Sequence, residues 1–183
     1  MLLSGPHSEE VVPPSLYRRL AGDLRANGVT VVADLSDERP EAVVEAGVDL
    51  LKVADGELAE SGRARSAEPA DLVDAMHQLQ SDGARAVVVT RAGDPALALS
   101  ADKEVQLVHS PPLGPMEPRG AGDSLTAGMT ACLAKGDPSE TALRIGAACG
   151  ALDAVRHGLG TGGATAVEIL AHRVRITAFD EDG

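Results

Sequence analysis

The chain has 183 residues, of which 44% are hydrophobic, and this is enough to form the core of a single domain. Its 16 Lys and Arg residues against 28 Asp and Glu residues give a formal net charge of −12, which repels the phosphates of nucleic acids and anionic membrane surfaces. With one Tyr and one Phe, the chain also lacks stacking platforms for single-stranded nucleic acid, so we expect neither nucleic acid nor a membrane as its partner.

Helices and strands alternate in the first half of the sequence. The predicted helices lie at residues 13–27, 40–46, 55–61 and 70–81, and the predicted strands lie at residues 29–34, 49–53 and 84–90. The strands are nearly all apolar, as in "VTVVAD" at residues 29–34. Such runs are typical of strands that are buried on both faces of a parallel sheet.

A predicted hairpin and three helices follow in the second half. The hairpin strands lie at residues 95–100 and 104–109, the helices at 123–135, 138–156 and 166–172, and a last strand at 174–177. Asp137 is predicted to cap the second of these helices, with Pro138 in its first turn and Glu140 returning to the cap. The element order predicts one domain over residues 1–183, with a three-layer α/β/α architecture, a mostly parallel sheet, and a site in the loops after the strands.

The sequence predicts a cytoplasmic protein. No apolar run reaches about 18 residues, and the short apolar start at residues 1–3 is followed by polar residues, so neither a transmembrane helix nor a signal peptide is predicted. Cys132 and Cys149 lie in apolar helical segments without Cys-x-x-Cys or His spacing. We interpret both as reduced core residues.

The segment "EPRGAGDSLTAG", residues 117–128, places glycines at the predicted start of a helix. The first turn of a helix has unpaired backbone N–H groups and the positive end of the helix dipole, and Gly120 and Gly122 let an anion approach them. A carboxylate beside a bound phosphate, such as that of Asp123, can accept a proton from an attacking hydroxyl. The motif therefore predicts a phosphate cradle with a neighbouring base.

A purely structural interpretation of the same motif is also open. Asp and Ser are favoured as helix caps, and glycine-rich turns precede many helices that bind nothing. The local motif by itself does not decide between the two interpretations. We interpret Ser124 as a hydroxyl at the helix N-terminus and not as a nucleophile, because no His lies near it in the sequence.

Longer stretches resemble the C-terminal part of the ribokinase-like, PfkB-type carbohydrate kinases. These are "RGAGDSLTAG" at the start of one helix and "GALDAVRHGLGTG" at the end of the next. Upstream, "VTVVADLSDE" and "AGVDLLKVADGELAE" are similar to the family's strand ending in Asp and its Lys-Pro-Asn-x-x-Glu-Leu segment. Four stretches agree in order over nearly the whole chain. The resemblance implies a ribokinase-like kinase that transfers a phosphoryl group from ATP, with Mg²⁺, to a sugar or sugar phosphate, with phosphofructokinase-like members as our first choice.

The resemblance also implies roles for single residues. Asp123 matches the catalytic base, and Gly120, Ala121 and Gly122 match the anion hole that holds the transferring phosphoryl group and so contacts the nucleotide. Ser124 has no matching role.

Further matches concern the nucleotide and the metal. Thr90 and Gly93 match a nucleotide-binding loop, and Ala147 to Gly150, with the "GLGTG" loop, match a region that lines the adenine. Lys52 matches the Lys of Lys-Pro-Asn, and Glu57 matches the glutamate that organises Mg²⁺ through water.

The chain departs from the family pattern at several positions. Residues 117–119, Glu-Pro-Arg, replace the usual Asp-Thr before the glycines, which argues against a cation site there and lets Arg119 face a phosphate. Ala54 replaces the Asn of the Asn-x-x-Glu motif, and Ala92 and Pro95 replace a Gly-x-x-Gly pair. These changes weaken the match to the nucleotide loop.

The family's first strands, lid and sugar-binding motifs have no counterpart in this sequence. We therefore expect a kinase domain that is shortened on its N-terminal side and contains an ATP half-site. Its exposed sheet edge is expected to pair with another subunit, and a homo-oligomer is one such arrangement. The alternative is a non-catalytic kinase relative that binds nucleotide or a partner subunit. A flavodoxin-like or dehydrogenase fold is disfavoured, because the glycine cradle lies late in the chain and not after the first strand.

Overall fold

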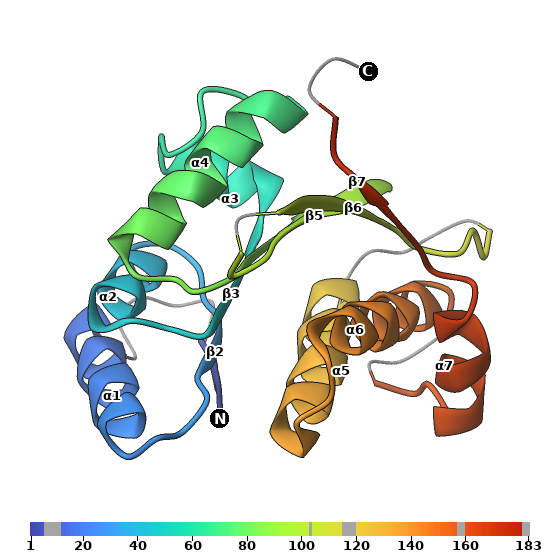
Figure 1. The fold of residues 1–183 in the computed structure, drawn as a ribbon, viewed down its shortest axis with the longest axis horizontal. Helices are drawn as coiled ribbons and strands as arrows, with labels where there is room; N and C mark the ends of the chain where they lie inside the picture. The colour runs from blue at the N-terminus through green and yellow to red at the C-terminus, as the bar shows by residue number, and fades with distance from the viewer. Residues whose placement is uncertain (6–11, 103, 115–119, 157–159, 181–183) are drawn as a thin grey trace. The chain divides into compact units, whose positions relative to one another are not determined.

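The computed structural model describes residues 1–5, 12–102, 104–114, 120–156 and 160–180 (Figure 1). The elements along the chain are β1 (Leu2–Ser4), α1 (Pro14–Ala26), β2 (Val32–Asp34), α2 (Arg39–Ala46), β3 (Leu50–Ala54), α3 (Asp55–Glu60), α4 (Pro69–Asp82), β4 (Val87–Arg91), β5 (Asp94–Leu99), β6 (Val105–His109), α5 (Ala121–Lys135), α6 (Ser139–Ala154), α7 (Ala164–Ala171) and β7 (Arg175–Ala178). The strands form one sheet in the order β1-β2-β3-β4-β5-β6-β7, and β1 to β4 are parallel. This confirms the predicted α/β class with its mostly parallel sheet.

The chain divides into two compact units. The first contains residues 1–91, 96–106 and 178–183, and the second contains residues 92–95 and 107–177. Strands β1 to β4 and helices α1 to α4 belong to the first unit, and helices α5 to α7 belong to the second. The single domain over residues 1–183 stays a prediction.

The strand order explains how the helices of the first unit are placed. Because β1 to β4 are neighbours in chain order and connections between parallel strands are right-handed, the connecting helices fall on one face of these strands (Figure 1). The strands are apolar on both faces, and Val31, Ala33, Leu51 and Val87 are fully buried. Helix α4 covers them with one apolar face: its buried residues are Leu72, Val73, Ala75, Met76 and Leu79.

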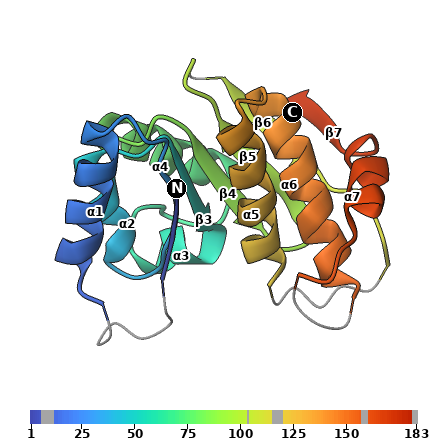
Figure 2. The same cartoon turned by 90° about the horizontal axis from the view of Figure 1, so that it is seen from below.

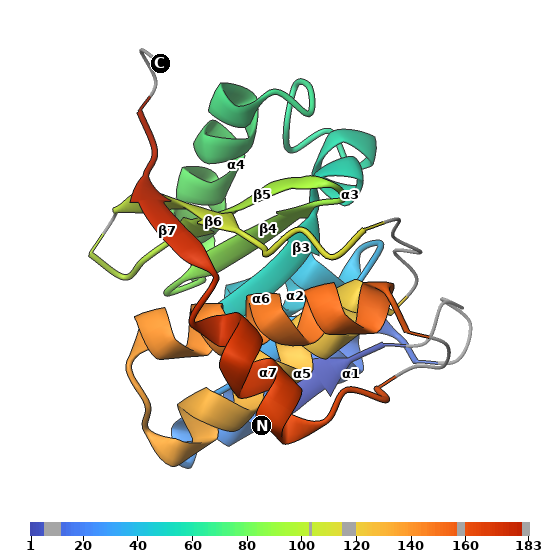
Figure 3. The same ribbon diagram turned by 90° about the vertical axis from the view of Figure 1, so that its right-hand side faces the viewer.

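Helices α5, α6 and α7 form the body of the second unit, with α7 beside α6 (Figures 2 and 3). Helices α5 and α6 come close together because glycines face the partner helix. A Cβ atom added to Gly128 would lie 2.8 Å from Cys149 Sγ, and one added to Gly146 would lie 2.8 Å from the carbonyl oxygen of Leu125. The α5–α6 contact therefore depends on positions that have no side chain.

The two cysteines lie in this helix pair. Both are free thiols, with Cys132 buried on α5 and Cys149 partly buried on α6. Burial raises the pKa of both thiols, and the negative charge of Asp137 raises the pKa of Cys132 further. Both lie in helices as predicted, but only Cys132 is a buried core residue. Within the described ranges, no helix is long and apolar enough to cross a membrane.

Most predicted elements are present, but one strand was missed and one predicted helix cap needs correction. The strand β1 was not predicted, because three residues are too short for a recognisable pattern; it pairs with β2. Helix α6 begins at Ser139, one residue later than predicted, so Asp137 is not its cap. The cap position belongs to Pro138, whose backbone is extended and whose carbonyl accepts the N–H of Ala142 at 3.0 Å.

Candidate active site

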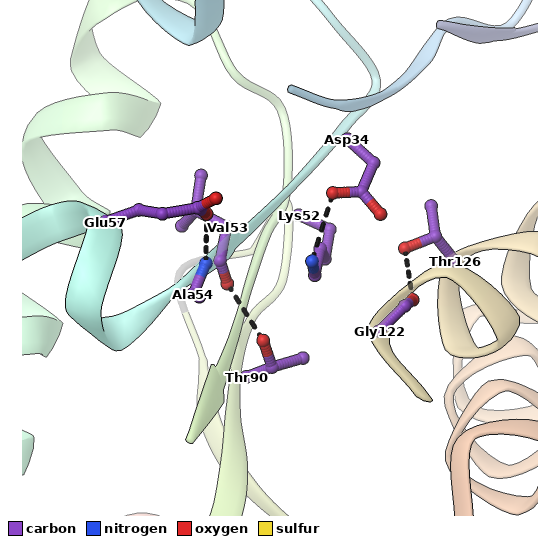
Figure 4. A network of polar contacts seen from close by, with 8 residues as sticks. All are labelled: Asp34, Lys52, Val53, Ala54, Glu57, Thr90, Gly122 and Thr126. Carbon is purple, nitrogen blue, oxygen red and sulfur yellow. Dashed lines mark hydrogen bonds and ion pairs between the residues drawn. The ribbon is translucent and has the colours of Figure 1, made fainter. Parts of the chain in front are cut away.

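Polar side chains gather at the carboxyl ends of three neighbouring parallel strands in the first unit. Asp34 ends β2, Lys52 is the middle residue of β3, and Thr90 lies near the end of β4 (Figure 4). The strand register places Asp34 beside Lys52, and Ala54 beside Thr90. Ligand sites of open α/β sheets lie at this edge, so the structure brings together three of the polar groups that the sequence singles out.

Lys52 and Asp34 form a buried ion pair. The ammonium of Lys52 donates to Asp34 Oδ1 at 3.0 Å, and the two side chains are 10% and 12% exposed. Removing one member of such a pair leaves the other charge buried, which is strongly unfavourable. The sequence predicts Lys52 as a nucleotide contact but not its pairing with Asp34. The available signal was an apolar strand that ends in an acid at the carboxyl edge of a parallel sheet.

Glu57 and Thr90 are held by backbone groups at the same edge. Glu57 Oε2 accepts the N–H of Ala54 at 2.7 Å, so this carboxylate satisfies an N–H group at the start of α3. Thr90 donates to the carbonyl oxygen of Val53 at 3.4 Å. In the part of the chain that the structure describes, no three His, Cys, Asp or Glu side chains are grouped to hold a metal ion. The Mg²⁺ role of Glu57 stays a prediction.

A cavity of about 550 Å³ also lies in the first unit. Its lining includes Glu57, Glu41 and Arg63, but not Lys52 or Thr90. Arg63 donates to Glu41 at 3.1 Å and to Asp82 at 2.7 Å, which ties the loop after α3 to α2 and α4. Glu57 therefore lies between the carboxyl edge of the strands and this acidic cavity.

The predicted cradle lies in the second unit at the start of α5. Gly120 occupies the cap position with φ 83° and ψ −10°, a left-handed conformation that favours glycine. The first helical hydrogen bond runs from the N–H of Ser124 to the carbonyl of Gly120, at 2.9 Å. The N–H groups of residues 121–123 meet no acceptor among the described residues. The helix therefore begins at the glycines as predicted and presents N–H groups that are unpaired in the described part of the chain, together with the positive end of its dipole.

Asp123 lies in the first turn of α5 and is exposed. Because Gly120 is the cap and no side chain makes a capping hydrogen bond, the interpretation of Asp123 as a helix cap is wrong. Its carboxylate makes no hydrogen bond or ion pair within the described residues. An exposed carboxylate beside unpaired N–H groups is free to take a proton.

Gly150 and Ala147 of α6 are buried. A Cβ atom on Gly150 would lie 2.8 Å from the carbonyl oxygen of Ala121 and 3.3 Å from Leu125 Cβ. The backbone of α6 at Gly150 therefore packs directly against the first turn of α5. The predicted contacts of Gly150 and Ala147 with a nucleotide stay predictions.

The remaining predicted residues lie in loops. Gly93 is exposed in the two-residue turn between β4 and β5, where Ala92 has a left-handed φ of 44°. Of the "GLGTG" loop, residues 158 and 159 lie outside the described residues, as do residues 117–119 with Arg119. Gly160 donates its N–H to Asp153 Oδ1 at 2.7 Å. The sequence reasoning missed Asp153, although an acid in the apolar stretch "GALDAV" was a usable signal.

Comparisons with known proteins identify the family of the chain. The model of the "pfkB family carbohydrate kinase" matches residues 3–166. The chain is 31% identical over 150 residues to a 1-phosphofructokinase of Bacillus subtilis, covering 82% of this chain and 49% of that protein. It is 28% identical over 142 residues to the ATP-dependent 6-phosphofructokinase isozyme 2 of Escherichia coli, covering 76% of this chain and 46% of that protein.

Solved structures show the same fold. A structure from Staphylococcus aureus, assigned as a phosphofructokinase, superimposes with a TM-score of 0.83 at 27% identity, covering 98% of this chain and 57% of that one. A ribokinase of Arabidopsis thaliana, complexed with ribose and ATP, has a TM-score of 0.79 at 20% identity, covering 93% of this chain and 55% of that one. The predicted ribokinase-like fold is thereby confirmed. The chain spans about half the length of the curated relatives that it matches.

Proposed function

Because the chain belongs to the pfkB family of carbohydrate kinases, we propose that it carries the phosphoryl-transfer part of an ATP-dependent, phosphofructokinase-like sugar kinase. The acceptor in this proposal is a hydroxyl group of a sugar phosphate, since the two curated relatives described above are phosphofructokinases. The observation that carries the proposal is the first turn of α5, where N–H groups that meet no acceptor among the described residues lie next to the exposed Asp123.

The N–H groups of Ala121, Gly122 and Asp123 suit a phosphoryl group that gains charge as it is transferred. They belong to the backbone of a helix, so they are already oriented and need no rearrangement during the reaction. The helix dipole adds a partial positive charge at the same place. Gly120 and Gly122 have no side chain that would block an anion.

Asp123 acts as the base in this proposal. As the oxygen of the acceptor hydroxyl forms a bond to the transferring phosphorus, the bond from that phosphorus to the leaving ADP oxygen breaks, and the hydroxyl proton passes to the carboxylate of Asp123. Ser124 takes no part in this proposal, because no His lies near it in the sequence to activate its hydroxyl as a nucleophile.

ATP supplies the phosphoryl group, and Mg²⁺ neutralises charge on its phosphates. Magnesium ions in nucleotide sites usually keep several waters and bind one or two carboxylates together with the phosphates. Glu57 fits this pattern, because only its Oε2 is used by the N–H of Ala54. Lys52 contributes a positive charge that is partly balanced by Asp34. We assign both residues, with Thr90 and Gly93, to nucleotide and metal binding on the family resemblance.

The test measures ATP turnover against a panel of sugars and sugar phosphates, with wild type, Asp123→Asn and Ser124→Ala. Loss of a general base lowers turnover by about 10² to 10⁴-fold, so we expect that loss for Asp123→Asn and a loss of less than about tenfold for Ser124→Ala. If Asp123→Asn loses less than about tenfold, Asp123 is not the base.

A second candidate function is nucleotide binding without phosphoryl transfer, alone or with a partner subunit. It is favoured by the replaced motif positions Ala54 and Ala92. Calorimetry with ATP and Mg²⁺ separates the two candidates, since binding without turnover on any acceptor supports the second. Light scattering tests the predicted self-association.

A further inference from the structure

A buried acid lies near the end of α6. Asp153 is only 4% exposed, and its Oδ1 accepts a 2.7 Å hydrogen bond from the N–H of Gly160. Its other oxygen, Oδ2, is buried and meets no hydrogen-bond donor in the described part of the chain. Burying a carboxyl group with an unpaired oxygen is unfavourable. Apolar residues would pack here at lower cost, so the hydrogen bond to Gly160 is the feature that requires explanation.

The bond fixes the loop between α6 and α7 to the end of α6. Gly160 has a left-handed φ of 65°, and two residues later a Cβ atom on Gly162 would lie 2.8 Å from Leu152 Cδ2. The loop therefore lies against consecutive residues of α6, through a hydrogen bond at Asp153 and through packing at Leu152. A hydrogen bond to a carboxylate is stronger than one between neutral groups.

The same part of α6 supports the phosphate cradle. Gly150 lies three residues before Asp153, and residues three apart are neighbours on a helix surface. Gly150 packs against the carbonyl of Ala121 in the first turn of α5. One turn of α6 thus holds both the start of α5 and the loop that contains Gly160, all within the second unit.

We propose that Asp153 is a positioning residue that holds the loop at residues 160–163 for the part of the nucleotide beyond its terminal phosphate. This inference rests on the proposed function, because it takes the first turn of α5 as the site of that phosphate. Asp153 does not touch the nucleotide. It acts through the N–H of Gly160, which it keeps in place.

Three variants separate the acceptor role of Asp153 from its shape and charge. Asp153→Leu keeps a side chain branched at the same carbon but has no acceptor, whereas Asp153→Asn keeps an acceptor and removes the charge. Glu168→Gln removes a charge from an exposed position on α7 and serves as the control. If Asp153→Leu does not fold, as judged by circular dichroism, Asp153→Ala replaces it, because Ala is too small to clash.

The first readout is hydrogen exchange at the amide of Gly160. Loss of a hydrogen bond to a charged acceptor should make this amide exchange at least about tenfold faster in Asp153→Leu. We expect intermediate protection in Asp153→Asn, whose neutral acceptor makes a weaker hydrogen bond, and wild-type protection in Glu168→Gln. Unchanged exchange in a folded Leu or Ala variant would overturn the proposal.

The second readout compares two ligands by calorimetry, ATP with Mg²⁺ and inorganic tripolyphosphate with Mg²⁺. We expect Asp153→Leu to weaken ATP binding about tenfold, the same factor as the lost hydrogen bond, and to leave tripolyphosphate binding unchanged. Asp153→Asn should bind tripolyphosphate like wild type and should weaken ATP binding less than Asp153→Leu does. Equal weakening of both ligands, or of neither, would refute the positioning role.

The two proposals fail in different ways. If wild type binds neither ligand, the proposed function and the nucleotide role of Asp153 both fail, while the exchange of Gly160 still decides whether Asp153 holds the loop. If wild type binds ATP and the Leu variant binds it equally well despite faster exchange at Gly160, the proposed function stands and the positioning role falls.

Discussion

The change Gly150→Ala tests the support that α6 gives to the cradle. A Cβ atom at this position would lie 2.8 Å from the carbonyl oxygen of Ala121, which is backbone and cannot rotate away as a side chain can. Overpacking of this kind costs about 1–3 kcal/mol. Against it stands the higher helix propensity of Ala, which is about 1 kcal/mol better than that of Gly. We expect a net loss of up to about 2 kcal/mol in the free energy of unfolding.

The matched control is Gly22→Ala in α1, where an added Cβ atom meets nothing within 4 Å. This variant should gain about 0.5–1 kcal/mol, because only the helix propensity changes. Urea denaturation of both variants and wild type measures the difference, which corresponds to roughly 2–4 °C in Tm for each kcal/mol in a chain of this size.

The same variant reports on the cradle itself. If Ala121 shifts to make room for the new methyl group, the N–H groups of the first turn of α5 shift with it, and tripolyphosphate binding should weaken in Gly150→Ala but not in Gly22→Ala. If Gly150→Ala is as stabilising as Gly22→Ala, α6 does not lie this close to α5, and the account of the cradle's support is wrong.

Three further predictions concern stability. Ala92→Gly should stabilise the protein by about 1 kcal/mol in urea denaturation, since Ala92 has a left-handed φ of 44° that costs a residue with a side chain about 1–2 kcal/mol; no gain would mean that the turn is relaxed. Lys52→Met should cost more than Arg18→Met, because it removes the charge partner 3.0 Å from a carboxylate whose side chain is only 12% exposed, whereas the exposed ion pair of Arg18 is worth less than about 1 kcal/mol; equal losses in urea would contradict this. Burial, and then the positive charge of Arg175, lower the pKa of His109, so the fold favours its neutral form. The stability that neutral His109 contributes is complete above its ordinary pKa of about 6.5 and is lost as the pH falls through the lowered pKa. Thermal melts of wild type and His109→Gln over this pH range test the prediction.

The order and type of the elements follow from the sequence, because they depend on local patterns. Apolar runs such as residues 29–34 predict buried parallel strands, and leucines at helical spacing predict the helices that cover them. The start of α5 is equally local, because Gly120 supplies the left-handed cap that the chain needs there. The orientation of the N–H groups in that first turn then follows from helix geometry alone.

The tertiary structure alone decides which distant residues meet. Lys52 pairs with Asp34 across 18 residues of sequence, and Gly150 lies behind Ala121, which only the alignment of α6 with α5 could reveal. The role of Asp153 is equally hidden in the sequence, because its hydrogen bond to Gly160 forms only when the loop folds back onto α6. By itself, the sequence determined most of the helices and strands, the family likeness and a glycine-rich helix start with an acid in its first turn, because these features are carried by short continuous stretches of the chain. Packing decided which segments the buried polar and small residues contact, because a contact between distant segments exists only once the chain has folded.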